Sequence, residues 1–450
     1  MRKKSSIGNS MNYIFFLLRN EDLNFLSQIS GTKNYNYPII RGIIVFFGGF
    51  IKSLKDMRLK INHPNKYTIF LYWNSINNKS VIDPISNIID NSGTISFKNK
   101  ADIKLFGFGA YFISLLYFPI VLYQYFNEKN SGLRNVYKYR FAYVWRSFGL
   151  YIYLRSFFSS CKNKVLVIPN DHEFKARIIR LAAFEKKVPT VYIQHASISP
   201  YFPPLDFEYA FLDGEDALEK YSKIGNSDTI VFLTGNAKYD DWFSVINRST
   251  IITNLGICPG IIDGVAEVQT LIIFIKSKFP NIKLFLRPHP SDKRIEIWKT
   301  ITGDLNVEMN DSVHCSSFDF LKSTDAIIAC ESNIHLEAAI LNVIPIYYNF
   351  QETVIYNDVY GFLKKRLVYD CQKSFELINI LLDEILNSKP DVSHKIKPYI
   401  DTASTKYQGC SASLMAKLVV EIQNKKIDFS IWEKCREYHN IRAYKLRIEV

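Results

Sequence analysis

Residues 281–292, NIKLFLRPHPSD, end in side chains that could bind an anionic group. The first half alternates apolar residues with others, and this period of two predicts a strand that enters a hydrophobic core. Arg287 and His289 follow, and the proline after each one fixes the backbone and removes an N–H donor. We expect a rigid corner that holds the guanidinium and the imidazole outward, with further donors from a helix that begins after Ser291. A proline-stiffened surface corner is the alternative interpretation.

A glycine loop precedes this segment, in LGICPGIIDG at residues 255–264. Gly260 lies between a predicted strand and a predicted helix, where backbone N–H groups could approach a phosphate. The spacing is neither GxGxxG nor the Walker A pattern, so a plain turn is the alternative.

The segment CESNIHLEA, residues 330–338, places Ser332 and Asn333 at the start of a predicted helix and Glu337 about one turn further in. The helix start could bind a phosphate, and the carboxylate could accept hydrogen bonds from two ribose hydroxyls. An N-cap with a glutamate that stabilises the helix dipole is the alternative. The predicted nucleotide-binding residues are therefore Gly260, Arg287, His289, Ser332, Asn333 and Glu337.

His195, at the end of VYIQHAS, is the best candidate for a general base, because the ordinary pKa of histidine is close to neutral. Asp171 and Asp213 are competing candidates, and each follows a predicted strand. A buried histidine with satisfied hydrogen bonds is the alternative interpretation of His195.

The sequence predicts neither a metal site nor another cofactor. No strict Asp-x-Asp occurs, and only the looser Asp171-His172-Glu173 and Asp213-Gly214-Glu215 pair carboxylates, so a Mg²⁺-dependent nucleotide site is not expected. The seven cysteines are scattered without a Cys-x-x-Cys pair. That distribution argues against zinc and against a disulfide framework, and it favours a reducing compartment.

Short apolar strands and amphipathic helices alternate after residue 160, which predicts parallel sheets. One series covers 164–235 and a second begins near 250, so we expect an α/β protein with two Rossmann-like domains facing a central cleft. The predicted domains are 1–248 and 249–425, and residues 426–450 are expected to form a helix that packs back on the first. In open parallel sheets ligands lie beyond the carboxyl ends of the strands, where all the candidate residues fall.

The formal net charge of +13 belongs to the first third of the chain, since residues 1–160 hold 21 Lys and Arg against 7 Asp and Glu, and the remainder holds 35 against 36. Three aromatic and apolar clusters, 39–55, 105–126 and 139–158, lie in the same third. This combination predicts a surface for anionic lipid. Nucleic acid fits less well, because the basic residues are interleaved with long aliphatic runs, and an ordinary solvated face is a further alternative.

Residues 105–126 carry no formal charge over a length that could span a bilayer. Pro119 in the middle favours a buried or interfacial helix pair instead, which is compatible with lying on a membrane. The N-terminal apolar run is too short for a secretory signal and lacks a small-x-small cleavage site, so no signal peptide is predicted.

The strand ends together resemble bacterial GT-B-fold glycosyltransferases that build surface polysaccharide. The resemblance covers residues 164–350 and is carried by VIPND, VPTVYIQHAS, LTGNAKYDDW, FLRPHPSD and ACESNIHLEAAILNVIPIYY. The Arg-Pro-His-Pro corner and the Ser-x-x-x-x-Glu helix resemble the HP and serine motifs of sialyl- and Kdo-type transferases, and also the matching parts of CDP-glycerol polymerases. The family's His-Gly strand end appears here as His195-Ala196, and the sialyltransferase Asp/Glu-Asp/Glu-Gly signature appears only in part, as Leu212-Asp213-Gly214.

The resemblance implies an inverting, metal-independent glycosyltransferase that uses a nucleotide-sugar, with CMP-sugar favoured, and in which His289 and Ser332 hold the nucleotide phosphates. The acceptor would be capsule or lipopolysaccharide, or a lipid-linked oligosaccharide, and the protein would be cytoplasmic and peripheral on the inner membrane face. A CDP-glycerol or polyol phosphotransferase and a UDP-GlcNAc 2-epimerase-like enzyme are alternatives on the same fold. A non-catalytic partner of a polysaccharide assembly complex is the alternative of another class.

Overall fold

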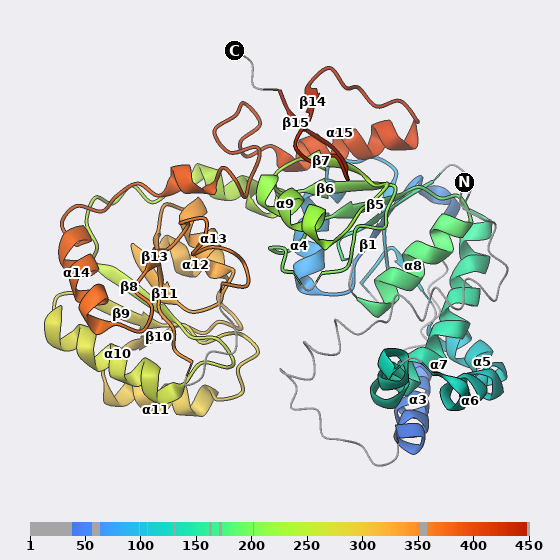
Figure 1. Ribbon diagram of the computed structural model, residues 1–450, viewed down its shortest axis with the longest axis horizontal. Helices are drawn as coiled ribbons and strands as arrows, with labels where there is room; N and C mark the ends of the chain where they lie inside the picture. The colour runs from blue at the N-terminus through green and yellow to red at the C-terminus, as the bar shows by residue number, and fades with distance from the viewer. Residues whose placement is uncertain are drawn as a thin grey trace.

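The computed structural model describes residues 38–55, 64–98, 100–105, 107–129, 131–161, 164–170, 173–200, 202–351 and 358–447. Over these residues the chain forms two lobes, each built on its own sheet with helices against it (Figure 1). The sheets are parallel apart from one hairpin at the edge of the first. The prediction of an α/β protein with two parallel-sheet units is confirmed.

The N-terminal lobe contains a nine-stranded sheet in the order β14-β15-β7-β6-β5-β4-β1-β2-β3. Its strands are β1 (Ile69–Tyr72), β2 (Ser92–Ser96), β3 (Ile103–Lys104), β4 (Val165–Ile168), β5 (Thr190–Ile193), β6 (Tyr209–Leu212), β7 (Ile230–Leu233), β14 (Trp432–Lys434) and β15 (Arg442–Leu446). The strands β4 to β7 match the four expected from the sequence. Strands β1 to β3 lie in the first third of the chain, where no strand was predicted.

Alternate residues of the central strands enter two separate cores. Phe70 and Ile168 face a core that includes residues of α7 (Ser131–Ser159), α8 (Phe174–Glu185) and α9 (Glu215–Ile224). Leu71 and Val167 face the opposite core, with α4 (Ile76–Ser86) and α15 (Ser411–Gln423). A sheet covered on both faces needs continuous apolar strands, as IFLY and VLVI are.

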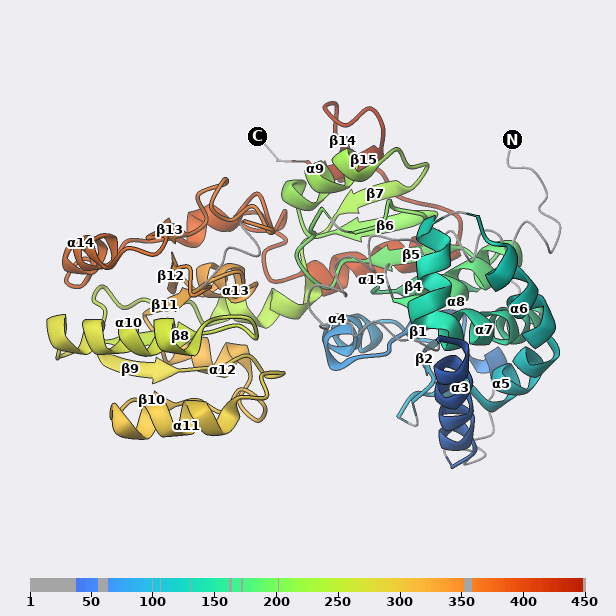
Figure 2. The same ribbon diagram turned by 60° about the horizontal axis from the view of Figure 1, so that its bottom comes forward.

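A helical group extends from one end of this sheet and consists of α3 (Pro38–Lys55), α5 (Gly107–Leu116), α6 (Phe118–Asn127) and the first part of α7 (Figure 2). Its own aromatic core includes Phe46, whose ring stacks on Trp145 with centroids 3.6 Å apart. The expected helix pair over 105–126 is present as α5 and α6. Among the described helices none is long and apolar enough to cross a membrane alone, although α5 and α6, bent by 64°, meet both criteria as a pair.

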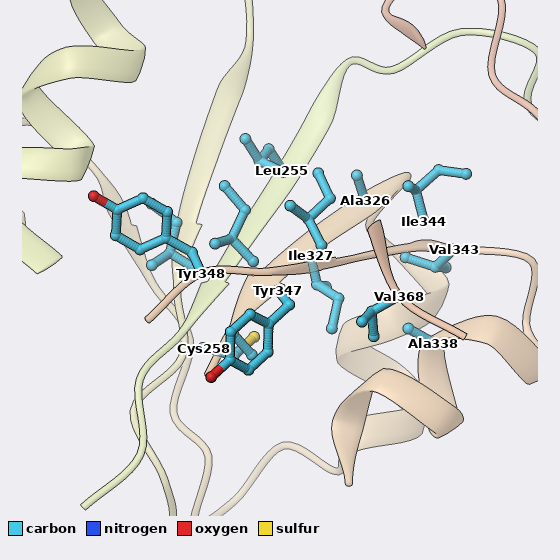
Figure 3. Packing of buried hydrophobic residues seen from close by; sticks show 14 of the residues in the cluster. Leu255, Cys258, Ala326, Ile327, Ala338, Val343, Ile344, Tyr347, Tyr348 and Val368 are labelled. Atoms are coloured by element: carbon cyan, nitrogen blue, oxygen red, sulfur yellow. The ribbon is translucent and has the colours of Figure 1, made fainter. Parts of the chain in front are cut away.

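The C-terminal lobe contains a six-stranded sheet in the order β10-β9-β8-β11-β12-β13. The strands are β8 (Asn254–Cys258), β9 (Lys283–Leu286), β10 (Glu308–Met309), β11 (Ala326–Ala329), β12 (Ile344–Tyr347) and β13 (Tyr369–Asp370), and the helices are α10 (Val265–Lys278), α11 (Ile295–Asp304), α12 (Ser317–Lys322), α13 (Ile334–Ile340) and α14 (Phe375–Ile385). Leu255, Ile327 and Tyr347 are among the side chains that fill one continuous core (Figure 3). Short 3-10 helices occupy Pro64–Lys66, Ala237–Ser244 (η2) and Ser393–Ile396.

The C-terminal tail differs from the prediction. Residues 426–447 contain the antiparallel strands β14 and β15 and no helix, and β15 adds to the edge strand β7, so the predicted helix over 426–450 is wrong for the described residues. The preceding helix α15 already packs on the N-terminal sheet, so the C-terminal lobe ends before it and not at residue 425. Burial on both faces of the sheet explains the difference, because Ala443 packs in one core and Trp432 and Leu446 pack in the opposite one.

Candidate functional site

The candidate site lies where the carboxyl ends of β5, β6 and β7 meet the segment that follows β11 in the other lobe. Ser197, after β5, donates a 2.5 Å hydrogen bond from Oγ to Oδ1 of Asn333, the residue before α13. The amide of Asn333 donates in turn to the hydroxyl of Tyr239 in η2, at 3.4 Å. The predicted nucleotide residue Asn333 therefore contacts the strand ends of the N-terminal lobe directly.

An ion pair also joins the lobes at this place. Nζ of Lys238, in η2, lies 2.6 Å from Oε1 of Glu337, and the carboxylate side chain is only 9% exposed. Burial alone would lower the pKa of Lys238, but Tyr239, Glu337 and Asp213 outweigh it, so the pKa lies above its ordinary value. The lysine is therefore a permanent cation beside the predicted nucleotide-binding residues. Glu337 is predicted to bind ribose. Its Oε1 pairs with the Lys238 cation, whereas its other carboxylate oxygen is not part of this ion pair.

Asp213 follows β6 and is buried next to this cation. Its Oδ2 accepts a 3.0 Å hydrogen bond from the amide of Asn236, while its Oδ1 has no hydrogen-bond partner among the described residues. Burial raises the pKa of Asp213 well above its ordinary value, against the lowering effects of Asn236 and Lys238. Such a carboxyl group holds a proton at a higher pH than an exposed aspartate, so it is suited to proton transfer.

Gly214, the glycine of the Leu-Asp-Gly sequence, lies where another segment of the backbone approaches closely. A Cβ on Gly214 would lie 2.7 Å from the carbonyl oxygen of Pro398, because the chain returning from the C-terminal lobe crosses here. That returning segment donates from the backbone N–H of Asp401 to the carbonyl oxygen of Asp213, at 2.7 Å. A glycine is needed for this close approach whatever the chemistry of the neighbouring carboxyl group.

His195 lies two residues after β5 and is partly buried. The preceding residue, Gln194, accepts a hydrogen bond through Oε1 from the backbone N–H of Asp213, at 2.9 Å, which links the ends of β5 and β6. Two of the three predicted catalytic residues thus follow neighbouring strands of one sheet. Asp171, the third candidate, lies outside the described residues.

Arg287 does not point outward as expected. Its side chain is buried, with Nη1 donating to Oδ1 of Asn310 and Nη2 donating to the carbonyl oxygen of Cys315, at 3.0 Å for the second bond. The guanidinium also lies 5.2 Å from the centre of the Phe320 ring. These contacts fix the loop after β10, so the structure uses Arg287 to support the corner and not to present a donor to solvent.

His289 is the exposed group of the same corner. Its Nδ1 accepts a 3.1 Å hydrogen bond from the backbone N–H of Ser291, so a neutral ring must carry its proton on Nε2. Desolvation by the surrounding corner lowers the pKa of His289, and Arg287 adds to this, against the opposing effect of Asp292. The ring is therefore a neutral, oriented N–H donor at neutral pH.

The glycine loop lies beside His289, whose backbone N–H donates to the carbonyl oxygen of Pro259 at 3.0 Å. The backbone N–H of Gly260 donates to Oδ2 of buried Asp263 at 2.7 Å, so it is already used within the loop. Arg294 closes the loop from the other side, by donating to the carbonyl oxygens of Asp263 and Gly260. The loop is rigid and adjacent to the corner, but the expected phosphate donor at Gly260 is engaged.

Ser332 lies at the start of α13, where its Oγ accepts from the backbone N–H of Ile334 at 3.3 Å. Next to it, Glu331 accepts from the backbone N–H groups of Asp358 and Val359, at 2.5 and 3.1 Å. No group of three or more His, Cys, Asp or Glu among the described residues could hold a metal ion.

The structure adds Ser197, Asn236 and Lys238 to the residues selected from the sequence. All three follow β5 or β7, so the rule that ligands lie beyond strand carboxyl ends could have selected them. The partners of Ser197 and Lys238 belong to the other lobe, and this pairing depends on how the two lobes meet, which residue spacing does not predict.

Comparisons with known proteins bear on the fold. No family model and no curated protein matches the sequence. Among solved structures, a putative UDP-N-acetylglucosamine 2-epimerase from Listeria monocytogenes matches with a TM-score of 0.53 and 11% identity, over 81% of this chain and 98% of that chain. A second UDP-N-acetylglucosamine 2-epimerase matches with a TM-score of 0.50 and 13% identity, over 81% and 98%.

The wall teichoic acid polymerase TagF matches over 87% of this chain and 99% of that chain, with 11% identity and a TM-score of 0.45. At such identities the likeness to the two epimerase structures concerns the fold alone. With two parallel-sheet lobes joined at their strand carboxyl ends, the chain has the GT-B fold, as expected.

Proposed function

We propose that this protein is an inverting, metal-independent glycosyltransferase that moves a sugar from a nucleotide-sugar to a growing surface polysaccharide or a lipid-linked oligosaccharide. The observation that carries the proposal is the meeting of the two lobes. A buried carboxyl group, Asp213, and a partly buried histidine, His195, lie on the N-terminal side, and the ion pair between Lys238 and Glu337 links them to the predicted nucleotide residues. One lobe would hold the acceptor and the other the donor.

In this mechanism His195 accepts the proton of an acceptor hydroxyl, whose oxygen attacks the anomeric carbon from the face opposite the nucleotide. The bond between the anomeric carbon and the phosphate oxygen breaks, and the electron pair leaves with the nucleotide. Lys238 and the Nε2–H of His289 would stabilise the charge that develops on the phosphate, in place of a metal ion. Asp213 is the competing base, because its raised pKa suits it to hold the proton.

We propose a CMP-sugar as the donor, because the Arg-Pro-His-Pro corner resembles the HP motif of sialyl- and Kdo-type transferases and the matching part of CDP-glycerol polymerases. We further propose that the protein is cytoplasmic and lies on the inner face of the membrane, as an enzyme of capsule or lipopolysaccharide synthesis. The support is the helical group, where Ile44, Ile51, Phe112 and Leu116 are more than half exposed, together with the basic N-terminal third.

A UDP-GlcNAc 2-epimerase-like enzyme is the second candidate, because the solved structures with the higher TM-scores carry that description. An epimerase acts on a soluble nucleotide-sugar and needs no apolar face, so the exposed side chains of α3 and α5 count against it. The CDP-polyol phosphotransferase and the non-catalytic assembly partner stay as further alternatives.

A thermal-shift measurement with CMP, CDP, UMP, UDP and GDP, with and without Mg²⁺, tests the proposal. A nucleotide at about 100 times its Kd should raise the free energy of unfolding by about 2.7 kcal/mol. We expect a metal-independent response to CMP or CDP that is lost in His289→Ala and retained in His314→Ala, an exposed histidine of the same lobe. A response to UDP alone would overturn the donor class, and no response to any nucleotide would favour the assembly partner.

A further inference from the structure

A cavity of about 420 Å³ lies in the N-terminal lobe, between the helical group and the sheet edge, and no part of the proposed reaction uses it. It is formed by α3, α5, α7, the start of α8 and the ends of β2 and β3. Figure 2 shows α3, α5 and α7 gathered at this end of the sheet. Its lining residues are Val45, Phe46, Gly49, Lys52, Ser53, Phe97, Lys104, Leu105, Gly107, Phe108, Tyr111, Ala142, Tyr143, Arg146 and Lys175.

The charged side chains of this cavity are all cations. Lys52, Lys104, Arg146 and Lys175 line it, and none of the described lining residues is acidic. Even without Lys104, the like charges of Lys52, Arg146 and Lys175 repel each other around one cavity, and an anion inside would relieve that repulsion. The pKa of Lys175 is lowered, by burial first and then by Arg146, with smaller contributions from Lys98 and Lys52, although Glu173 opposes the shift.

Two of the four cations lie against aromatic rings. The guanidinium of Arg146 lies 4.4 Å from the centre of the Tyr111 ring, and Nζ of Lys175 lies 5.1 Å from that of Phe97. The Nε of Arg146 is buried and has no hydrogen-bond partner among the described residues. The Arg146 side chain nevertheless lines the cavity, and a guanidinium can donate to a bound oxyanion through charge-assisted hydrogen bonds.

The cavity borders the exposed apolar side chains of the helical group. Val45 and Tyr143 line it and are also 46% and 41% exposed, and Ile44 next to Val45 is 67% exposed. A ligand with a charged head and an apolar chain could therefore place its head among the cations and its chain along α3. The exposed apolar side chains beside the cavity suit a lipid chain better than a nucleic-acid strand.

We propose that this cavity binds the phosphate or diphosphate headgroup of a lipid whose apolar chain lies against the helical group. The inference names the chemical class of the acceptor and in that respect rests on the proposed glycosyl transfer. An acceptor held by its phosphate on the N-terminal lobe would be retained at the membrane through successive additions of sugar.

Vesicle flotation of the full chain tests the proposal with three lipid compositions: phosphatidylcholine alone, phosphatidylcholine with phosphatidic acid, and phosphatidylcholine with charge-matched phosphatidylglycerol. We expect tighter binding to the vesicles that contain the phosphomonoester, and a loss of about tenfold or more for Arg146→Gln/Lys175→Gln. Lys434→Gln/Arg436→Gln, two exposed cations on the tail hairpin with the same change in charge, is the matched control and should bind as the unsubstituted protein does.

Lys52→Gln, at an exposed residue of the cavity, is the second variant should the double substitution fail to fold. Equal binding of the cavity and control variants would overturn the proposal, as would equal binding to the two anionic lipids. If inorganic pyrophosphate stabilises the protein while the protein shows no preference among the vesicles, the cavity binds a soluble anion and the proposal of a lipid ligand is wrong. The nucleotide thermal shift should persist in the cavity variants, so failure here is distinguishable from failure of the proposed transfer.

Discussion

Asp213 combines a buried carboxyl group with a neighbouring cation, and its titration gives a prediction about pH. The folded protein holds this proton more tightly than the unfolded chain, whose ordinary pKa is 3.8. The stabilising effect of the proton is therefore complete below that pKa and is lost as the pH rises toward the raised folded value. We expect Asp213→Asn to melt at a higher temperature than the unsubstituted protein near neutral pH, and the difference to shrink as the pH falls toward 4.

Thermal melts of both proteins across this pH range measure the effect, and Asp325→Asn provides the contrast. Hydrogen bonds from Thr253, Asn254 and Asn247 outweigh burial and lower the pKa of Asp325, so its replacement should destabilise the protein more at neutral pH than in acid. A pH-independent difference for Asp213→Asn would show that this carboxyl group does not titrate differently on folding.

At the residue scale, the sequence predicted where polar groups gather but not which of them face solvent. The Arg-Pro-His-Pro corner follows β9 as expected, yet Arg287 turns inward to Asn310 and Cys315 while His289 stays accessible. The difference depends on acceptors that lie more than twenty residues further along the chain. Alternation in a strand reports which face a residue occupies, and it carries no information about such distant partners.

At the element scale, the crossing of α5 and α7 depends on one glycine. A Cβ on Gly149 would lie 1.9 Å from the carbonyl oxygen of Ala110 and 2.4 Å from Oγ of Ser114, so Gly149→Ala must separate the two helices. Overpacking of this kind costs about 1–3 kcal/mol. We expect a lower melting temperature and weaker binding to vesicles, because both helices line the cationic cavity.

Gly48→Ala in α3 is the control, because a Cβ there meets nothing within 4 Å. Within a helix the exchange of glycine for alanine should stabilise by up to about 1 kcal/mol. Equal melting temperatures for the two variants would show that α5 and α7 do not approach as closely as the structure has them.

The elements of the two regular α/β series were predictable, since their apolar strands and amphipathic helices alternate at ordinary lengths. Strands β1 to β3 were not predicted, because they lie among aromatic and apolar clusters that are typical of membrane-facing helices, although IFLY is a short apolar run like that of β4. The hairpin β14 and β15 was mistaken for a helix, since its role is to pair with the exposed edge of β7, which only the assembled sheet presents.

At the scale of the whole molecule, the lobes meet through paired groups that the sequence did not link. Besides Lys238 and Glu337, Lys365 of the C-terminal lobe lies 2.9 Å from Asp216 and 2.6 Å from Glu219 of α9. The residues of each lobe could be selected from strand ends, whereas their pairing required the arrangement of both sheets.

Transfer of a labelled sugar to a lipid-linked acceptor is the most direct test of the proposed glycosyltransferase. The full chain is incubated, without metal, with labelled CMP- or UDP-sugars and a lipid extract that contains the lipid-linked acceptor. The label in the lipid phase and the released nucleotide are both measured. We expect label in the lipid phase, an equal amount of free nucleotide, and loss of both in His195→Ala and His289→Ala. A labelled sugar that stays in solution as an isomer would identify an epimerase, and unchanged donor in every reaction would contradict the proposal of an enzyme.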